Sequence, residues 1–112
     1  ALEAAPRGVR VNAVAPGWIA SSGMDSYQGA VRKLIPRLKN HVPLRRLGTE
    51  AEVSAAICFL LSPGAAFITG VTLAIDGGAP LDSALFPVPD HRRAAAFDGF
   101  HRAVMPDVLK EA

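Results

Sequence analysis

The fold is decided by one stretch near the beginning of the chain, Val9-Arg10-Val11-Asn12-Ala13-Val14-Ala15-Pro16-Gly17-Trp18-Ile19. Its first half is rich in β-branched and small apolar residues, which is typical of a strand covered on both faces. Pro16 has no backbone N–H to donate to a neighbouring strand, so we expect the strand to end there. Gly17 allows backbone angles and close approaches that a side chain would prevent. The stretch therefore predicts a strand that ends in a Pro-Gly corner, and open α/β sheets bind ligands at such strand ends.

The overall composition indicates one globular domain. The chain has 112 residues, of which half are hydrophobic and a fifth are charged, a balance that separates it from disordered chains. The net charge of +2 is too small to indicate nucleic-acid binding. No apolar run approaches the roughly 20 residues needed to span a bilayer, and no stretch has the pattern of a signal peptide. We therefore expect a cytoplasmic protein whose partners include neither nucleic acid nor membrane.

The cysteine and histidine content argues against a metal centre or a disulfide. Cys58 is the single cysteine and lies in an apolar helical pattern, so we expect a buried, unreactive thiol in a reducing compartment rather than a nucleophile. The three histidines, His41, His91 and His101, do not have the spacing of metal ligands. Packing or surface roles are the favoured interpretation for all three.

The clearest helix signal begins at Thr49. Thr49 and Glu52 have the spacing of a capping box, in which each side chain satisfies a free backbone N–H at the start of the helix. The apolar residues that follow at helical spacing predict a single buried stripe, and they are Val53, Ala56, Ile57, Leu60 and Leu61. Ser62-Pro63-Gly64 is a signal for the end of this helix.

The other predicted elements complete an α/β pattern. Residues 17–28 are expected to be irregular, residues 30–41 to form a helix interrupted at Pro36, and residues 71–75 to form a second strand. The segment between the two strands is long enough for a right-handed crossover, so the strands are expected to be parallel. This order fits the last part of a doubly wound, Rossmann-like parallel sheet. Two such strands need further cover, so we do not expect the chain to fold well by itself.

Four sequence blocks resemble the C-terminal half of a short-chain dehydrogenase/reductase. They occur in the family's order and spacing, and they are the opening stretch, Pro43-Leu44-Arg45-Arg46-Leu47-Gly48-Thr49, Phe67-Ile68-Thr69-Gly70 and Ile75-Asp76-Gly77-Gly78. The resemblance covers about residues 1–80 and implies the C-terminal part of a dinucleotide-binding domain. Residues 81–112 form a tail that contains Pro and Phe. Short helices are expected there over residues 90–104 and from Pro106 onward.

The residues that carry out the chemistry in this family have no counterpart in the chain. The family uses a Gly-rich turn for the cofactor pyrophosphate, and a catalytic Tyr followed four residues later by a Lys. The only Tyr is Tyr27, and Val31 stands four residues later, so no catalytic residue is assigned. The first five residues read as the end of a helix broken by Pro6, and we expect the chain to be a piece of a longer protein. The cofactor implied by the resemblance is NAD or NADP, and the choice between them stays open.

The resemblance assigns cofactor binding to the corner. In the family, the backbone beyond the Pro-Gly block receives the nicotinamide carboxamide, so the implied residues are Pro16, Gly17, Trp18, Ile19 and Ser21. An extended Ile19 can offer an N–H and a C=O together. The Ser21 hydroxyl, where the family often has Thr, can bond the carboxamide or a phosphate oxygen. The alternative is an ordinary strand-ending turn with a serine on the surface.

Three large side chains are candidates for the substrate site. Trp18, Met24 and Tyr27 lie on the loop that closes over the substrate in the family, where apolar groups exclude water. Simple packing is an equally good interpretation of each residue alone. Asp76 is interpreted as a turn residue that bonds nearby backbone N–H groups.

A run of basic residues leaves the nature of the substrate open. It contains no acid, and its members are Arg32, Lys33, Arg37, Lys39, Arg45 and Arg46. One interpretation is a solvated helix face. The other is attraction for an anionic small-molecule substrate, for which an acyl-CoA with its phosphates is a candidate.

Two functional hypotheses follow. In the first, the chain is the C-terminal segment of an NAD(P)-dependent short-chain oxidoreductase acting on a carbonyl, an alcohol or an enoyl-CoA-type substrate. In the second, it is a non-catalytic interaction or oligomerisation module derived from the same fold. The resemblance also implies a homo-oligomer, a dimer or a tetramer. In many members of the family, the last strand and the helix that begins at Thr49 form a subunit contact.

Overall fold

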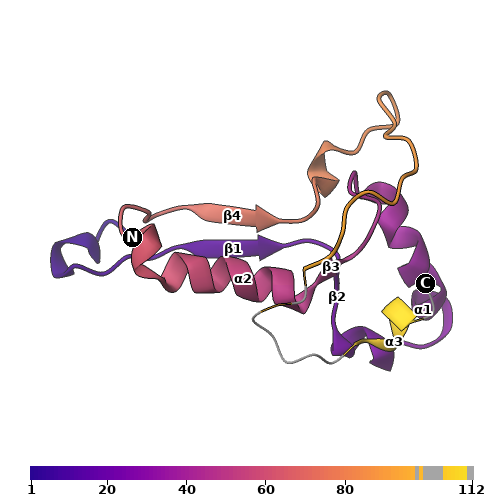
Figure 1. The fold of residues 1–112 in the computed structure, drawn as a ribbon, viewed down its shortest axis with the longest axis horizontal. Coiled ribbons are helices and arrows are strands. Elements are labelled where there is room, and N and C mark those ends of the chain that lie inside the picture. Colours follow the sequence, from indigo (N-terminus) through magenta and orange to yellow (C-terminus); the bar gives the residue numbers. More distant parts are fainter. Residues whose placement is uncertain (98, 100–104, 111–112) are drawn as a thin grey trace.

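The computed structural model of the chain describes residues 1–97, 99 and 105–110. Its centre is a pair of parallel strands, β1 (Ala13–Pro16) and β4 (Thr72–Ile75), with helix α2 (Glu50–Leu61) along them (Figure 1). At the carboxyl end of the strands lie α1 (Gly29–Leu38), α3 (Asp107–Lys110) and a second short pair, β2 (Ile19–Ala20) with β3 (Gly48–Thr49). The molecule is elongated, with extents of 49 × 36 × 26 Å. No helix in the described part of the chain is both long and apolar enough to cross a membrane.

The parallel pairing of the two predicted strands is confirmed. The register runs from Ala13 opposite Thr72 to Pro16 opposite Ile75. The strand is shorter at its start than predicted, because the Asn12 side chain donates to the Ile68 carbonyl and accepts from the Val71 N–H. The strand ends at Pro16, as predicted, and one further backbone bond follows it. Gly17 N–H donates to the Ile75 carbonyl at 2.9 Å, so the missing N–H of Pro16 lies on the side away from β4.

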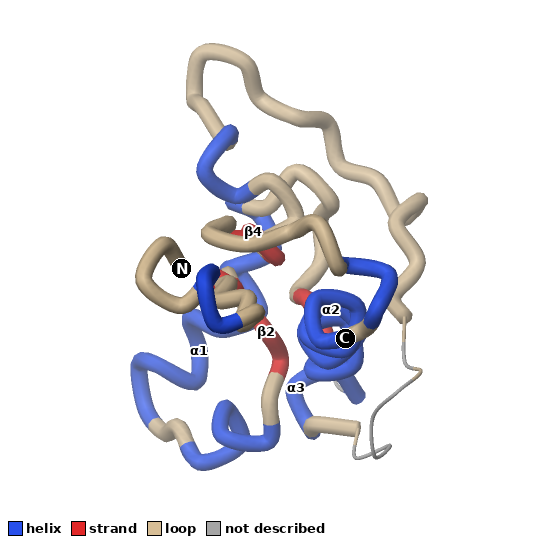
Figure 2. Tube along the Cα trace, turned by 90° about the vertical axis from the view of Figure 1, so that its left-hand side faces the viewer, coloured by secondary structure: helices blue, strands red, loops and turns tan. Residues whose placement is uncertain are grey.

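The apolar sequence predicted a sheet covered on both faces, but the structure leaves one face partly open. Val9 and Val11, in the segment that leads into β1, are 50% and 46% exposed, and Leu73 of β4 is 38% exposed. In the end-on view of Figure 2, α2 lies to one side of the strands, and the loop after β4 arches over towards that side. A strand this apolar is expected to need cover on its second face as well. The exposed strand residues therefore mark a surface that other chain segments would bury.

Helix α2 begins as predicted, but its apolar residues do not form one buried stripe. The capping box is present, with Glu52 N–H donating to Thr49 Oγ1 at 3.2 Å and Thr49 N–H donating to Glu52 Oε2 at 2.9 Å. Leu60 is buried, whereas Leu61 is 77% exposed. Cys58 is also exposed, which corrects the prediction of a buried thiol. The reason is that apolar residues surround this helix, and only one side of it meets the strands.

The segment after the corner is more regular than the sequence indicated. Residues 17–28 contain β2 and a 3-10 helix, Ser22–Ser26, instead of an irregular loop. Helix α1 is present as predicted, but the expected interruption at Pro36 is absent, because Pro36 lies inside the continuous helix Gly29–Leu38. A 3-10 turn follows at Lys39–His41. Strand β2 was missed because two residues are too few to show an alternating pattern.

The tail is mostly extended. Residues 90–97 form no helix, which corrects that part of the predicted helix over residues 90–104, and 98 and 100–104 lie outside the described residues. The predicted helix after Pro106 is confirmed as α3. Its residues Val108 and Leu109 pack against a small core of Ala20, Ile35 and Leu47. The tail thus returns to the segment that follows the corner.

We predict that these 112 residues in isolation do not unfold cooperatively. Among the described residues, the buried side chains are small or aliphatic, namely Ala20, Ile35, Val42, Leu47, Ala51, Leu60, Ala65 and Pro106. So little buried apolar surface does not offset the entropy of ordering the chain. Far-UV circular dichroism of the purified segment should show a broad, gradual thermal transition. A sharp transition from a monomer would contradict the prediction.

Candidate functional site

The corner at the end of β1 is fixed by a close approach of two strand ends. A Cβ atom on Gly17 would lie 2.7 Å from Cβ and 2.9 Å from Cα of Asp76, closer than real Cβ contacts come. Any side chain at Gly17 would therefore push β4 away. Asp76 holds the opposite turn by accepting from Gly78 N–H at 2.9 Å through Oδ1, which confirms its predicted turn role. The sequence predicted a close approach at Gly17 but did not indicate that Asp76 makes it.

Beyond the corner, Ile19 presents its backbone to an open side. Gly48 N–H donates to the Trp18 carbonyl at 2.9 Å, and the register places Ile19 opposite Gly48. In a parallel ladder with this register, Gly48 forms its hydrogen bonds with the residues before and after Ile19 and not with Ile19 itself. The N–H and C=O of Ile19 therefore point away from β3. An extended residue in this orientation can donate to and accept from one ligand amide at the same time.

Ser21 follows two residues later with an available hydroxyl. The residue is half-buried, and its hydroxyl makes no hydrogen bond within the described part of the chain. Its carbonyl accepts from Met24 N–H at 3.0 Å, which fixes the backbone around it. The structure therefore places the Ser21 hydroxyl on a fixed backbone, next along the chain to Ile19 and Ala20.

The three predicted substrate residues line one cavity. Trp18, Met24 and Tyr27 share a space of about 310 Å³ with four residues of α1, namely Val31, Leu34, Ile35 and Leu38. Trp18 and Tyr27 are 47% and 51% exposed. The wall is almost entirely apolar, so the cavity suits a nonpolar group rather than an ionised one.

A larger cavity, of about 620 Å³, lies between the corner, the end of β4 and the loop 42–48. Sequence reasoning missed this cavity because it needs the loop to fold back onto the glycines after β4. Gly77 allows this approach: its φ is +61°, and a Cβ there would lie 2.6 Å from Val42 Cγ1. No sequence signal other than the Gly-Gly pair could have indicated it.

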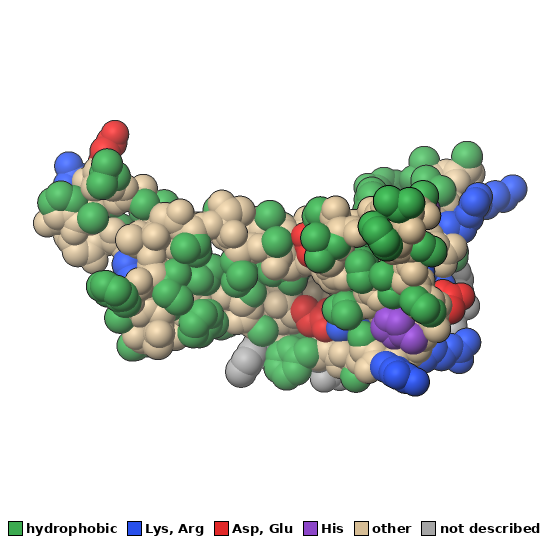
Figure 3. All heavy atoms as spheres, turned by 90° about the horizontal axis from the view of Figure 1, so that it is seen from above, with side chains coloured by type: hydrophobic (Ala, Val, Ile, Leu, Met, Phe, Trp, Pro, Cys, Tyr) green, Lys and Arg blue, Asp and Glu red, His purple; other side chains and the backbone are tan. Residues whose placement is uncertain are grey.

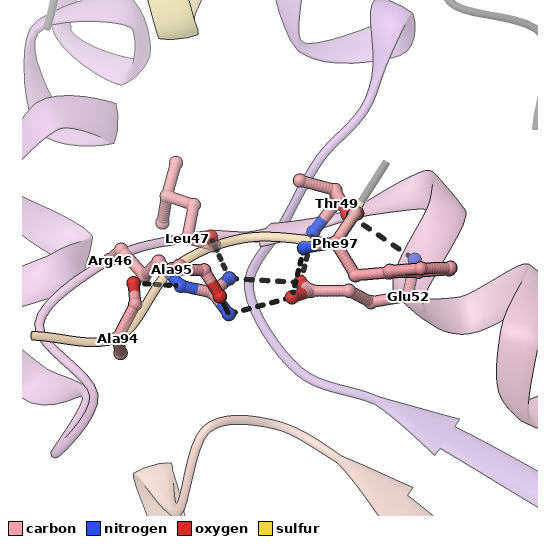
Figure 4. Close-up of polar contacts among 7 residues, drawn as sticks. All are labelled: Arg46, Leu47, Thr49, Glu52, Ala94, Ala95 and Phe97. Atoms are coloured by element: carbon pink, nitrogen blue, oxygen red, sulfur yellow. Dashed lines mark hydrogen bonds and ion pairs between the residues drawn. The ribbon is translucent and has the colours of Figure 1, made fainter. Parts of the chain in front are cut away.

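The capping box of α2 also anchors the tail (Figure 4). Arg46 donates to both carboxylate oxygens of Glu52, at 2.9 and 2.6 Å, and to the carbonyls of Ala94 and Ala95, at 2.9 and 3.1 Å. Glu52 Oε1 also accepts from Phe97 N–H at 3.1 Å. A bidentate Arg–carboxylate pair of this kind holds its geometry better than a single contact. We call Arg46 and Glu52 the tail clamp.

The tail has a second anchor, on the segment over the apolar cavity. Asp107 N–H, at the start of α3, lies 3.1 and 3.2 Å from the two carboxylate oxygens of Asp25. Asp25 belongs to the 3-10 helix Ser22–Ser26, which carries Met24 into the cavity wall. The tail therefore ties the start of α2 to the segment that carries Met24.

The structure divides the six basic residues of the predicted run. Arg46 belongs to the tail clamp. Arg45 forms an ion pair with Asp90 at 3.6 Å, and Arg32 forms one with Asp25 at 3.8 Å. The run is therefore not one continuous free patch.

The clamp strongly acidifies the Glu52 carboxyl. Partial burial by itself raises its pKa. The hydrogen bonds from Arg46 and from the N–H groups of Thr49 and Phe97, together with the Arg46 charge, outweigh this effect and lower the pKa from 4.5 to about 2. Glu52 is therefore ionised at neutral pH, and folding and the tail clamp depend on that charge.

Neither the histidines nor the acids form a metal site in the described part of the chain. His41 Nδ1 lies 3.3 Å from Asp82 Oδ2, and His91 Nε2 donates to the Pro43 carbonyl at 2.8 Å. His101 lies outside the described residues. The corner offers backbone amides and the Ser21 hydroxyl, and the cavity beside it is also lined by the charged side chains of Arg46, Glu52 and Asp76.

Parallel strands joined by helix, with a ligand-accessible corner at their carboxyl ends, define part of a Rossmann-like α/β domain. A family model described as enoyl-(acyl carrier protein) reductase matches residues 1–80. The chain therefore belongs to the short-chain dehydrogenase/reductase family, which confirms the resemblance seen in the sequence.

Individual relatives agree. An uncharacterized oxidoreductase of Mycobacterium tuberculosis is 42% identical over 90 residues, or 80% of this chain and 34% of that protein. Galactitol 2-dehydrogenase of Cereibacter sphaeroides is 44% identical over 78 residues, or 70% of this chain and 30% of that protein. The solved structure of YwfH, an NADPH dependent reductase involved in bacilysin biosynthesis, superposes with a TM-score of 0.60 at 29% identity and covers 70% of this chain and 32% of YwfH. The chain spans about a third of the length of the curated relatives it matches.

We predict that Glu52→Gln destabilises the full-length protein by about 1–3 kcal/mol at pH 7, since it weakens hydrogen bonds to a charged group. Because folding lowers the pKa of Glu52, its contribution is complete above about pH 4.5 and is lost as the pH falls towards 2. Urea unfolding at a series of pH values should show the difference between wild type and variant shrinking over that window. Glu3→Gln, the same change at an exposed carboxylate, is the control. An equal effect of both substitutions would contradict the role of the clamp.

Proposed function

We propose that the chain is the C-terminal segment of an NAD(P)-dependent oxidoreductase that transfers a hydride to or from a carbonyl, alcohol or enoyl-CoA-type substrate. The observation that carries the proposal is the corner. There the Ile19 backbone groups and the Ser21 hydroxyl follow a strand end and have no hydrogen-bond partner among the described residues. The matched galactitol 2-dehydrogenase and the NADPH dependent reductase YwfH support the general activity. The proposal includes a cytoplasmic location and a small-molecule substrate.

The corner would act by orienting the nicotinamide ring. The carboxamide of that ring is planar and rotates freely until its donor and its acceptor are both engaged. Ile19 offers an acceptor and a donor on one side, and Pro16 and Gly17 fix where Ile19 lies. Holding the amide exposes one face of the ring to the substrate, as hydride transfer requires. The cofactor supplies the hydride chemistry, and these residues supply its orientation.

The apolar cavity would receive the organic part of the substrate. Trp18 belongs both to the corner and to this cavity, so the two proposed sites share a wall. Met24 and Tyr27 also line this cavity and would help to exclude water from the reacting atoms. The segment that carries Met24 is tied to the tail through Asp25 and Asp107, so the tail would help to set the shape of the cavity.

A second candidate, a non-catalytic oligomerisation module, is favoured by one observation. Ile57 and Leu61, one helical turn apart on α2, are 39% and 77% exposed, and Phe59 is 49% exposed on another side of the helix. The same surface would serve a homo-oligomeric enzyme, a dimer or a tetramer. The two candidates differ in whether the complete protein binds a nicotinamide cofactor and turns it over.

We predict that the full-length protein oxidises or reduces a nicotinamide cofactor and that Ser21→Ala raises the KM for the cofactor about three- to tenfold. This range corresponds to one lost hydrogen bond of ordinary strength. Ser21→Thr, which keeps the hydroxyl, should retain the wild-type KM. Steady-state rates followed by nicotinamide absorbance measure both variants.

Two results would contradict the proposal. Absence of cofactor binding in the complete protein would favour the oligomerisation module. Equal KM values for wild type, Ser21→Ala and Ser21→Thr would remove Ser21 from the cofactor site, even if the protein is active.

A further inference from the structure

A second, polar cavity lies where the tail meets the end of α1. It has a volume of about 310 Å³ and is lined by Lys39, Asn40, Arg45, Asp90, His91 and Arg92. The two contributing segments are far apart in the sequence, so the basic run alone could not indicate it. On the face drawn in Figure 3, most Lys and Arg side chains gather at one end of the molecule, the end that holds α1.

Arg45 is held rigidly in the wall of this cavity. Its side chain is only 13% exposed, and its two terminal nitrogens donate to the carbonyls of Asn40 and Val88. The backbone of Arg45 has φ = +56°, an uncommon conformation for a residue with a side chain. Its Nε is buried and makes no hydrogen bond to the described residues, and its nearest acid is Asp90 Oδ1, which lies 3.6 Å away. Strained backbone and an unsatisfied buried donor are both typical of ligand sites.

Two exposed cations complete the wall. Lys39 and Arg92 are exposed, and neither side chain makes a hydrogen bond or an ion pair with the described residues. Arg45 faces one carboxylate, Asp90, which is 94% exposed, so that ion pair is weak. Three cations therefore stand against one solvated acid, and the cavity attracts anions.

The other polar groups of the cavity are already engaged. His91 Nε2 donates to the Pro43 carbonyl, and His91 Nδ1 accepts from Arg93 N–H at 3.3 Å. The Arg45 contact to the Asn40 carbonyl offsets the partial negative charge at the end of α1. These contacts hold the tail against α1 and leave Lys39 and Arg92 for a ligand.

We propose that this cavity, which we call the basic pocket, binds a phosphate group. A guanidinium with fixed geometry and two further cations match the charge and the several acceptor oxygens of a phosphate monoester or diphosphate. The space is large enough for a diphosphate. Leu38 lines the apolar cavity and Lys39 lines the basic pocket. If the proposed function holds, the phosphate would belong to the distal end of the substrate.

Binding of inorganic pyrophosphate to the full-length protein tests the basic pocket. Excess nicotinamide cofactor is present so that its own phosphate site is filled, and calorimetry measures the affinity. The double variant Lys39→Ala/Arg92→Ala should bind pyrophosphate at least about tenfold more weakly. Asp90→Asn removes the one carboxylate among the described residues that line the pocket, and this variant should bind pyrophosphate about threefold more tightly.

The matched control is Lys33→Ala/Arg37→Ala. It removes the same two charge types from exposed positions of α1 that do not line the pocket, and it should weaken binding less than about twofold. An equal loss in the two double variants, or no loss in either, would overturn the proposal. Since binding is read without turnover, this result stands whether or not the protein transfers a hydride.

A kinetic arm identifies the source of the phosphate. A CoA thioester and the same acyl group on a short thiol without phosphate are compared as substrates. A KM that rises in Lys39→Ala/Arg92→Ala for the CoA thioester alone supports a phosphate carried by the substrate. Unchanged KM values, together with weakened pyrophosphate binding, support a site for free phosphate.

Discussion

The parallel pairing of β1 with β4 is the constraint on which the rest of the structure depends. It brings two strand ends so close that Gly17 touches Asp76 with no room for a Cβ atom. The chain must then turn away from the sheet, and it does so into β2, whose pairing with β3 fixes the direction of the Ile19 backbone. The tight turns at Gly17 and Gly77 thus leave the backbone N–H and C=O of Ile19 available at the end of the sheet. These two groups are the physical basis for the proposed cofactor contact.

A local motif also carries a long-range role. The capping box at Thr49 and Glu52 would stabilise α2 in any context, but here Glu52 also pairs with Arg46 and Phe97, and Thr49 Oγ1 donates to the Phe97 carbonyl at 2.7 Å. The tail is therefore fixed at the start of α2 and again at Asp25. These two anchors connect the cofactor side of the molecule, the apolar cavity and the basic pocket through one segment of chain. A substitution in the tail clamp is thus expected to alter the structure of the cofactor side, the apolar cavity and the basic pocket.

Elements with strong local signals were predicted from the sequence, and elements made by distant contacts were not. The apolar run before Pro16, the capping box and the helix after Pro106 each have a physical cause within a few residues, and the structure has all three. Strand β2, the tail clamp and the basic pocket depend on contacts between residues that are far apart in the sequence. The periodicity of hydrophobic residues does not indicate contacts of this kind. Cys58 shows a different limit. Its apolar neighbours predicted burial, yet burial depends on a covering surface that this chain does not provide.

The most direct test of the central claim is a crystal structure of the full-length protein with its nicotinamide cofactor. We expect the carboxamide to lie about 3 Å from both the Ile19 N–H nitrogen and the Ile19 carbonyl oxygen, beside an intact Gly17–Asp76 contact. A carboxamide bound elsewhere, or a corner in which the β1–β4 pairing is broken when the cofactor is bound, would contradict it.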